Sequence, residues 1–387
     1  MKVRINKLDI MIILLWCAIF PFYIPIKDLY YIYQLVVTIV IWLFCLSEIR
    51  RIPLIIFLWM YPITIIVSSI INRNTILYTQ VVRGTTGALL MMGTFLIIHM
   101  YIRLKGTERL FAILYRMSKV YAVISILWVL GLIVIGKLGD AVQNEFLFLG
   151  GKFPTAYMLI FNLMLFLISW KGNKLLKSKY KKTIFFVLCL VDIIVCILIE
   201  TATGVVAIAL FFVFMILPGK ILKIVNKPVV LIMLIVGSMV IVFSLNIIIS
   251  LPIVQSLIVN VLHEDLSLTG RMQLYELLFP LMMKSGLWGG GYGSYVATRL
   301  GYHGWYNAQN GLAEIILTYG FLGAGSFLLM VFTVSLKSKE QIKPLNSALL
   351  VFIIIAIVEI PFNMSFVLLL ALIMMSNCKN IGKYPFY

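Results

Sequence analysis

The chain has 387 residues, of which 63% are hydrophobic and only 12% charged, and its mean hydropathy is +1.09. A soluble globular domain carries roughly 45–50% apolar and about 25% charged residues, so this composition excludes a water-soluble enzyme. The net charge of +18 would suit a nucleic-acid-binding protein, but the basic residues fall in short runs between long apolar stretches. That pattern is typical of a multi-pass membrane protein, whose basic residues orient its helices. The sequence therefore predicts a membrane protein with lipid around it and no nucleic-acid partner.

Twelve apolar runs follow one another along the chain, and a membrane span needs roughly 20 such residues. They lie at about residues 8–26, 29–47, 52–71, 84–102, 120–136, 155–169, 183–199, 203–218, 228–250, 312–335, 346–362 and 364–376. No small-residue cleavage site follows the first run, so we interpret it as an uncleaved span and not a signal peptide. The predicted fold is an all-α polytopic membrane protein with a nine-span region (1–250), an external loop (251–311) and a three-span region (312–387).

The distribution of basic residues predicts the orientation. With the N-terminus in the cytoplasm, 24 of the 32 Lys and Arg residues fall in segments assigned to the inside and 8 in segments assigned to the outside. Cytoplasmic loops of membrane proteins carry such an excess. We therefore expect both termini in the cytoplasm and residues 251–311 on the external face.

The predicted external loop differs in composition from the rest of the chain. It is rich in glycine and aromatic residues, and it holds two of the three histidines. Long loops of this kind are usually functional. Leucines at three- and four-residue spacing within 271–284 predict a short helix there, with one apolar face that lies on the outer leaflet and a kink at Pro280.

Four motifs occur in order across this part of the chain. They are Thr269-Gly270-Arg271, the glycine-rich run 286–293, the run 307–314 (NAQNGLAE) and the run 319–323 (YGFLG). Their order resembles the O-antigen ligase and polymerase family. Its members have a Gly-Arg at the start of a large external loop, a Gly-x-Gly-rich turn, a His-Asn pair, and a Glu leading into a Gly-x-x-Gly helix. The resemblance covers about 55 residues at the level of motifs, and the twelve-span layout agrees with it across the rest.

The sequence departs from the family pattern at two places. Gln309 stands where the family commonly has the histidine of His-Asn, and His303 lies six residues upstream. Many members also carry a Ser-Arg near the outer end of an earlier span, where this chain has Glu200-Thr201-Ala202-Thr203-Gly204. These departures put a histidine-based mechanism in doubt, and they leave anion binding to Arg83, Arg271 or Arg299.

The resemblance implies a GT-C-like fold and glycosyl transfer from an undecaprenyl-diphosphate-linked oligosaccharide at the outer face of the bacterial inner membrane. An acceptor hydroxyl attacks the anomeric carbon and the lipid diphosphate leaves. This reaction needs cations at the leaving group and a hydrogen-bond acceptor near the nucleophile. At family level the partners are the lipid-linked substrate and a polysaccharide chain-length regulator. No Cys/His cluster has metal-ligand spacing, so we expect neither a metal nor another cofactor.

Each candidate for catalysis also has a structural alternative. Arg271 is the first candidate for the diphosphate, because a guanidinium fork matches phosphate oxygens, but a helix-flanking arginine also reaches to the interface. Glu314 lies just inside an apolar run, where a carboxylate serves either catalysis or an ion pair with Arg271 or Arg299. His303 is a general-base candidate by its ordinary pKa range, and the alternative is a solvated loop residue. Glu200 is either a proton acceptor or an interfacial residue.

A second set of residues is predicted to bind substrate. It comprises Arg83, Arg299, Gln309, Asn310, Thr203 and Gly290. The alternatives are interfacial anchoring for Arg83 and a solvated loop position for Arg299. The glycines at 289–293 also permit turns with positive φ and close backbone approach.

Three functions fit the sequence. The first is a polymerase that joins lipid-linked repeat units of a capsule, an exopolysaccharide or O-antigen. The second is an O-antigen ligase, which transfers finished polymer to a lipid A core. The third is a flippase or transporter of lipid-linked oligosaccharide, which would need ionisable residues spread through both halves of the chain. Because the polar residues are concentrated in one external segment, the sequence favours chemistry at the membrane surface over transport.

Overall fold

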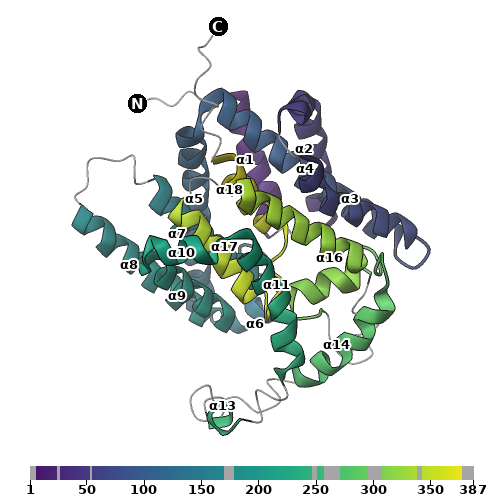
Figure 1. Cartoon of the computed structure of the whole chain (residues 1–387). Coiled ribbons are helices and arrows are strands. Elements are labelled where there is room, and N and C mark those ends of the chain that lie inside the picture. Colours follow the sequence, from purple (N-terminus) through teal and green to yellow (C-terminus); the bar gives the residue numbers. More distant parts are fainter. Residues whose placement is uncertain are drawn as a thin grey trace.

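The computed structural model describes residues 6–23, 27–52, 55–169, 178–245, 251–256, 271–294, 307–337 and 342–376. Within these ranges the regular elements are helices (Figure 1), and one isolated bridge joins Leu147 to Gly150. The helices are α1 (Lys7–Ile19), α2 (Lys27–Cys45), the 3-10 helix η1 (Leu46–Arg51), α3 (Ile55–Ile71), α4 (Tyr78–Lys105), α5 (Thr107–Val134), α6 (Leu138–Gln143), α7 (Lys152–Ser169), α8 (Ser178–Leu198), α9 (Ala202–Ile216), α10 (Gly219–Val225), α11 (Pro228–Phe243), α13 (Pro252–Ser256), α14 (Arg271–Ser285), α16 (Gly311–Lys337), α17 (Lys343–Ile355) and α18 (Met364–Ser376). The predicted all-α class is confirmed.

Each of the twelve apolar runs coincides with one helix. Five stretches are long and apolar enough to cross a membrane by themselves: Leu29–Arg51, Tyr78–Lys105, Thr107–Val134, Lys152–Ser169 and Gly311–Lys337. A sixth forms if α10 and α11, which meet at a bend of 66°, make one span. Four further apolar helices are shorter. The chain is therefore a multi-pass helical membrane protein, and the full count of twelve crossings stays a prediction.

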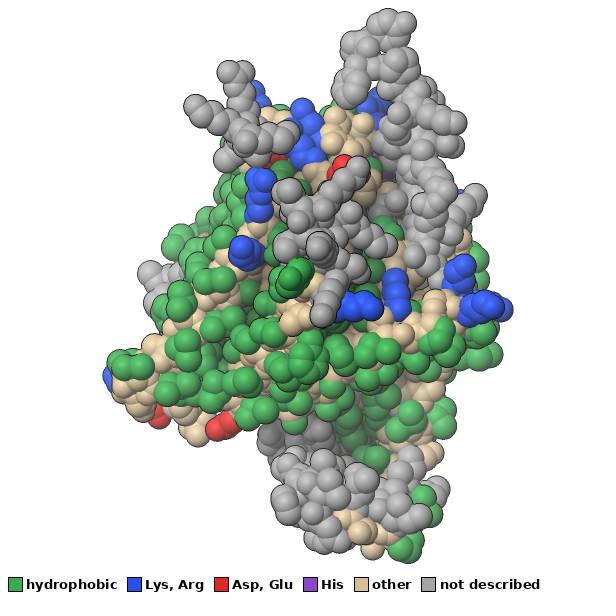
Figure 2. All heavy atoms as spheres, turned by 90° about the vertical axis from the view of Figure 1, so that its left-hand side faces the viewer, with side chains coloured by type: hydrophobic (Ala, Val, Ile, Leu, Met, Phe, Trp, Pro, Cys, Tyr) green, Lys and Arg blue, Asp and Glu red, His purple; other side chains and the backbone are tan. Residues whose placement is uncertain are grey.

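The outer helices carry exposed hydrophobic stripes. On α2 the stripe consists of Leu29, Ile32, Val36, Ile39 and Leu43, and α5 repeats the same spacing with Val120, Val123, Leu127, Leu130 and Val134. Figure 2, which views the left-hand side of Figure 1, shows hydrophobic side chains in a broad band, with most of the Lys and Arg side chains above it. Soluble proteins rarely expose apolar patches of that extent, so the band marks the surface that contacts lipid.

The centre of the bundle is formed by α16 and α18. Every residue from Phe366 to Met375 in α18 is at most 2% exposed, as expected of a helix that is hydrophobic on all sides. α16 packs against α3, α11, α14 and α18, and α4 packs against α2, α3 and α18.

Two buried carboxylates join the first helices to α4 and α5. Glu48 in η1 is fully buried, and its oxygens lie 2.7 Å from Arg103 Nη2 and 2.8 Å from His99 Nδ1. Asp9 in α1 accepts hydrogen bonds from the Tyr101 hydroxyl at 2.6 Å and from Arg109. Buried carboxylates are tolerated when they are paired in this way. The two clusters fix α1 and α2 against the α4–α5 pair at the end predicted to face the cytoplasm.

The short helix predicted at 271–284 is confirmed as α14, which runs through Pro280. The prediction that its leucine face lies on the outer leaflet is wrong. Leu274 and Leu278 are fully buried, and α14 packs against α16 and α11. The exposed apolar side chains of α14 are Phe279 and Met283, on the other face. The helix is apolar on both sides, so spacing alone did not distinguish its protein contact from its lipid contact.

Candidate functional site

The glycine-rich loop, residues 286–294, pairs with a break in α16. At Gly320 the backbone leaves the helix, with φ 71° and ψ −173°. Four backbone hydrogen bonds connect the loop to this break, namely Gly290 N to Leu317 O at 3.0 Å, Gly291 N to Thr318 O at 2.8 Å, Phe321 N to Gly286 O at 3.2 Å and Leu322 N to Leu287 O at 3.1 Å. A helix that breaks in an apolar environment frees backbone groups that need new partners, and the loop supplies them.

Glycine is required at both sides of this pairing. A Cβ at Gly320 would lie 2.2 Å from the Leu287 carbonyl oxygen, and a Cβ at Gly289 would lie 2.5 Å from the Gly320 nitrogen. Gly289, Gly291 and Gly293 have positive φ. The prediction of positive-φ turns and close backbone approach at 289–293 is confirmed. The amide of Gly290 is occupied by the Leu317 carbonyl, so its role in the structure is to hold the loop to α16.

Polar side chains of α3 hold the opposite edge of the loop. Ser68 donates to the Trp288 carbonyl, the Ser69 hydroxyl accepts from Tyr292 N at 3.2 Å, and Asn72 Nδ2 donates to the Gly289 carbonyl at 3.2 Å. On α4, a Cβ at Gly84 would lie 2.6 Å from Tyr292 Cβ. The loop therefore packs between α3, α4 and α16, and these contacts fix its position.

This packing brings Arg83 next to the glycine-rich loop. The Arg83 guanidinium carbon lies 3.7 Å from the ring centroid of Tyr31, a cation–π geometry. Tyr292 is close enough to both for charge interactions. Burial and the phenol of Tyr31 raise the pKa of Tyr292, and the positive charge of Arg83 opposes the rise. Segments from α2, α4 and the glycine-rich loop thus meet at one guanidinium.

A tyrosine cluster, defined as Tyr31, Tyr61, Tyr292 and Tyr319, extends from Arg83 toward Glu314. The rings of Tyr61 and Tyr319 are 6.0 Å apart. Tyr292 is within electrostatic reach of Tyr319, and both Tyr61 and Tyr319 are within reach of the Glu314 carboxylate. The structure therefore places a cation and a carboxylate at the two ends of a set of phenols.

The start of α16 is held by Asn310 and Glu314. The Asn310 side-chain oxygen accepts from the Leu312 and Ala313 amides at 3.1 and 2.9 Å, which makes Asn310 the N-cap. Its amide nitrogen donates to Ser238 Oγ on α11 at 3.3 Å and to the Ile357 carbonyl at 3.2 Å. Asn310 is fully buried and its hydrogen bonds are all internal. It therefore positions the site and does not project into it.

Glu314 and Gln309 lie on either side of this cap. Glu314 Oε2 accepts from the Ala308 amide at 2.9 Å. Gln309 has φ 46°, and its side-chain oxygen is buried with no hydrogen-bond partner among the described residues. A positive φ in a residue other than glycine is strained and tends to occur at functional sites. An unsatisfied buried acceptor beside a carboxylate is a place where a ligand hydroxyl would gain a hydrogen bond.

Thr203 contacts a carboxylate that was not among the sequence candidates. Its hydroxyl lies 3.3 Å from Glu359 Oε1, and Glu359 is buried in the connection between α17 and α18. The same connection supplies the Ile357 carbonyl that binds Asn310. The signal in the sequence was a carboxylate two residues before Pro361 in an apolar run. The connection between α17 and α18 is not helical, and non-helical backbone at membrane depth is tolerated where it lines a polar interior.

The remaining predicted residues lie elsewhere or outside the description. Glu200 is exposed, with φ 55°, and its carbonyl oxygen accepts from Lys152 Nζ at 3.2 Å. Arg271 begins α14, but its side chain lies outside the described part, as do His303 and Arg299. Within the described ranges no three His, Cys, Asp or Glu side chains gather as metal ligands would. The structure therefore places Gln309, Asn310 and Glu314 at the start of α16, Gly290 at the break in α16, and Arg83 beside Tyr31 and Tyr292.

A scan of family models, a search of curated proteins and a search of solved structures each gave no match to this chain.

Proposed function

We propose that this chain is a membrane glycosyltransferase that polymerises undecaprenyl-diphosphate-linked oligosaccharide repeat units at the external face of the bacterial inner membrane. The proposal includes twelve spans, both termini in the cytoplasm, and the glycine-rich loop on the external side. One observation carries it. The Arg83 guanidinium lies over the Tyr31 ring and interacts with Tyr292, while the Glu314 carboxylate interacts with Tyr61 and Tyr319. The tyrosine cluster thus connects a cation and a carboxylate that are far apart in the sequence, and it includes Tyr292 of the glycine-rich loop.

The arrangement provides the groups that glycosyl transfer needs. The Arg83 guanidinium binds the diphosphate oxygens as the leaving group develops charge. The Glu314 carboxylate, oriented by the Ala308 amide, accepts the proton of the attacking hydroxyl. The buried oxygen of Gln309 accepts a sugar hydroxyl. In this proposal Arg271 and Arg299 are further phosphate ligands, while His303 and Glu200 are alternative proton acceptors.

The first test is chain extension by purified protein supplied with lipid-linked repeat units. Arg83→Ala removes the leaving-group cation, and we expect extension to fall by roughly 10²–10³-fold, as when one charge-stabilising donor is removed from an active site. Arg73→Ala is the matched control, because Arg73 is an exposed arginine in the turn between α3 and α4. Full extension by Arg83→Ala would contradict the assignment of Arg83.

A cellular test separates the three functions. After deletion of the gene, a polymerase predicts that surface glycan collapses from long chains to a single repeat unit. Long chains that stay on the undecaprenyl carrier would instead identify a ligase. Lipid-linked units that remain on the cytoplasmic face, together with no extension by the purified protein, would identify a flippase.

A further inference from the structure

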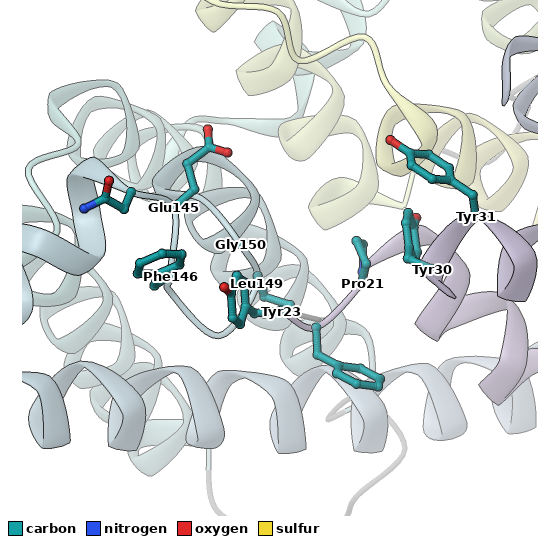
Figure 3. A pocket seen from close by; sticks show the side chains of 10 residues that line it. Pro21, Tyr23, Tyr30, Tyr31, Glu145, Phe146, Leu149 and Gly150 are labelled. Atoms are coloured by element: carbon teal, nitrogen blue, oxygen red, sulfur yellow. The ribbon is translucent and has the colours of Figure 1, made fainter. Parts of the chain in front are cut away.

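A cavity of about 420 Å³ lies beside the tyrosine cluster, and no step proposed above uses it. Residues Pro21–Tyr23, the start of α2 and the loop between α6 and α7 form its walls (Figure 3). It shares Tyr31 with the candidate site, and Arg83 lies over that ring. Its volume is within the range of small-ligand sites. The cavity is therefore contiguous with the proposed catalytic region and large enough for a sugar unit.

Two aromatic pairs line the cavity on opposite sides. The rings of Tyr23 and Phe146 are 5.3 Å apart, and those of Tyr30 and Tyr31 are 5.6 Å apart. Figure 3 shows Pro21 between the two pairs. A cage for a quaternary ammonium needs rings that surround one point, whereas these pairs form an extended surface. Flat aromatic faces set along an open cavity suit the apolar C–H faces of a saccharide.

Backbone and side-chain hydrogen bonds hold these walls in place. Tyr23 N donates to the Phe148 carbonyl at 2.6 Å, and Trp128 Nε1 donates to the Phe146 carbonyl at 3.1 Å. The Tyr30 hydroxyl donates to the Ala18 carbonyl at 2.8 Å. The aromatic surfaces are therefore preorganised, which reduces the entropy lost when a ligand binds.

The polar part of the lining is a carboxylate and a carboxamide. Glu145 has φ 58°, a strained value for a glutamate, and Asn144 precedes it in the same turn. Both side chains accept hydrogen bonds from hydroxyls. The lining residues include no Lys or Arg, so a negatively charged group inside the cavity would lie with the Glu145 carboxylate, and Arg83 reaches only the outer Tyr31 side.

We infer that this cavity is a second saccharide subsite, which holds an uncharged or amine-bearing sugar of the glycan while the next unit reacts. The inference rests on the proposed function for the origin of that glycan. A subsite next to Arg83 would retain the growing chain between additions. Its loss would therefore shorten the polymer without removing the chemical step.

The test uses the purified full chain in phosphatidylglycerol nanodiscs, which avoids sugar-headed detergents. The probe is an oligosaccharide of two to four repeat units, released by mild acid from the cells' own surface polysaccharide and followed by saturation-transfer NMR. Phe146→Ala, at a ring that is 45% exposed, should weaken binding at least about tenfold, and Phe146→Tyr should retain it. Glu145→Gln should weaken binding by a smaller factor. Tyr78→Ala, at an exposed ring outside the cavity, should leave binding unchanged.

The outcomes separate the subsite from the proposed function. Weaker oligosaccharide binding in Phe146→Ala supports the subsite even if the wild-type protein fails to extend lipid-linked units, a failure that would overturn the polymerase alone. With extension intact in the wild type, unchanged binding and unchanged product length in both Phe146→Ala and Glu145→Gln would overturn the subsite and leave the polymerase standing. Displacement of the oligosaccharide by choline at equal concentration would also overturn it, because the cavity would then be an ammonium site.

Discussion

Gly320 interrupts α16 with backbone angles that a side chain rarely adopts, and the Leu287 backbone passes where a Cβ would be. The break exposes backbone groups of α16, and the glycine-rich loop binds them. Gln309 likewise combines a positive φ with a buried side-chain oxygen that has no hydrogen-bond partner in the described part of the chain. Single residues of the motifs thus shape the backbone of the site as much as they provide its chemistry.

Replacement of Gly320 by alanine should destabilise the protein. The strained φ alone costs about 1–3 kcal/mol, and the clash of the Cβ with Leu287 would displace the glycine-rich loop. Gly325→Ala in the same helix is the matched control, since nothing lies within 4 Å of its Cβ, and it should be neutral or slightly stabilising. Thermal unfolding of both variants in nanodiscs measures the difference. Equal unfolding temperatures would show that the loop does not depend on the break.

Glu314→Gln tests the carboxylate without removing its hydrogen bond. A glutamine oxygen still accepts from the Ala308 amide, so the start of α16 should stay intact and the unfolding temperature should change little. Chain extension should fall by roughly 10²–10⁴-fold, the usual contribution of a general base. Full activity in this variant would identify Glu314 as a capping residue only.

Among the elements, hydrogen bonds connect α16 to three other parts of the bundle, two at its start and the glycine-rich loop at its break. Asn310 caps α16 and also binds α11 and the α17–α18 connection. The glycine-rich loop binds α3 and α16. Residues 271–294 and 307–311 of the predicted external loop are thus packed onto the bundle, whereas α13 (Pro252–Ser256) lies apart from it (Figure 1).

Asn310→Ala should therefore cost about 1.5–5 kcal/mol of folding free energy. The lost cap contributes about 0.5–2 kcal/mol, and the Ile357 carbonyl left without its donor adds about 1–3 kcal/mol. Asn310→Ser keeps a capping oxygen but loses the bonds to α11 and to Ile357, so it should fall between alanine and the wild type. Unfolding by denaturant measures all three proteins. If serine equals alanine, the cap contributes nothing.

At the scale of the whole molecule, the basic residues are arranged asymmetrically. Arg103 and Arg109 flank the α4–α5 connection and bind the buried carboxylates Glu48 and Asp9. These two arginines count among the basic residues that predict the membrane orientation. They therefore also stabilise the fold, because they pair with buried carboxylates. Exposed apolar stripes occupy the belt between the two ends of the bundle.

The orientation is tested by labelling cysteines from outside the cell. Tyr78→Cys, at a position 80% exposed in the wild type, should react with a membrane-impermeant maleimide on intact spheroplasts. Glu108→Cys, exposed at the start of α5, should react only after permeabilisation. The unsubstituted chain gives the background, since its described cysteines are buried or half-buried. The reverse pattern would invert the orientation.

The sequence by itself determined the helices, the short helix α14 and the positive-φ turns of the glycine-rich loop. These depend on hydropathy and backbone preference within a few residues. It also identified Arg83, Glu314 and Gln309 as candidates. Only the tertiary structure decided which face of α14 contacts protein and that Glu359 binds Thr203. It also decided that Arg83 and Glu314 share one tyrosine cluster. Those facts depend on contacts between segments separated by up to several hundred residues, and a local sequence pattern cannot predict such contacts.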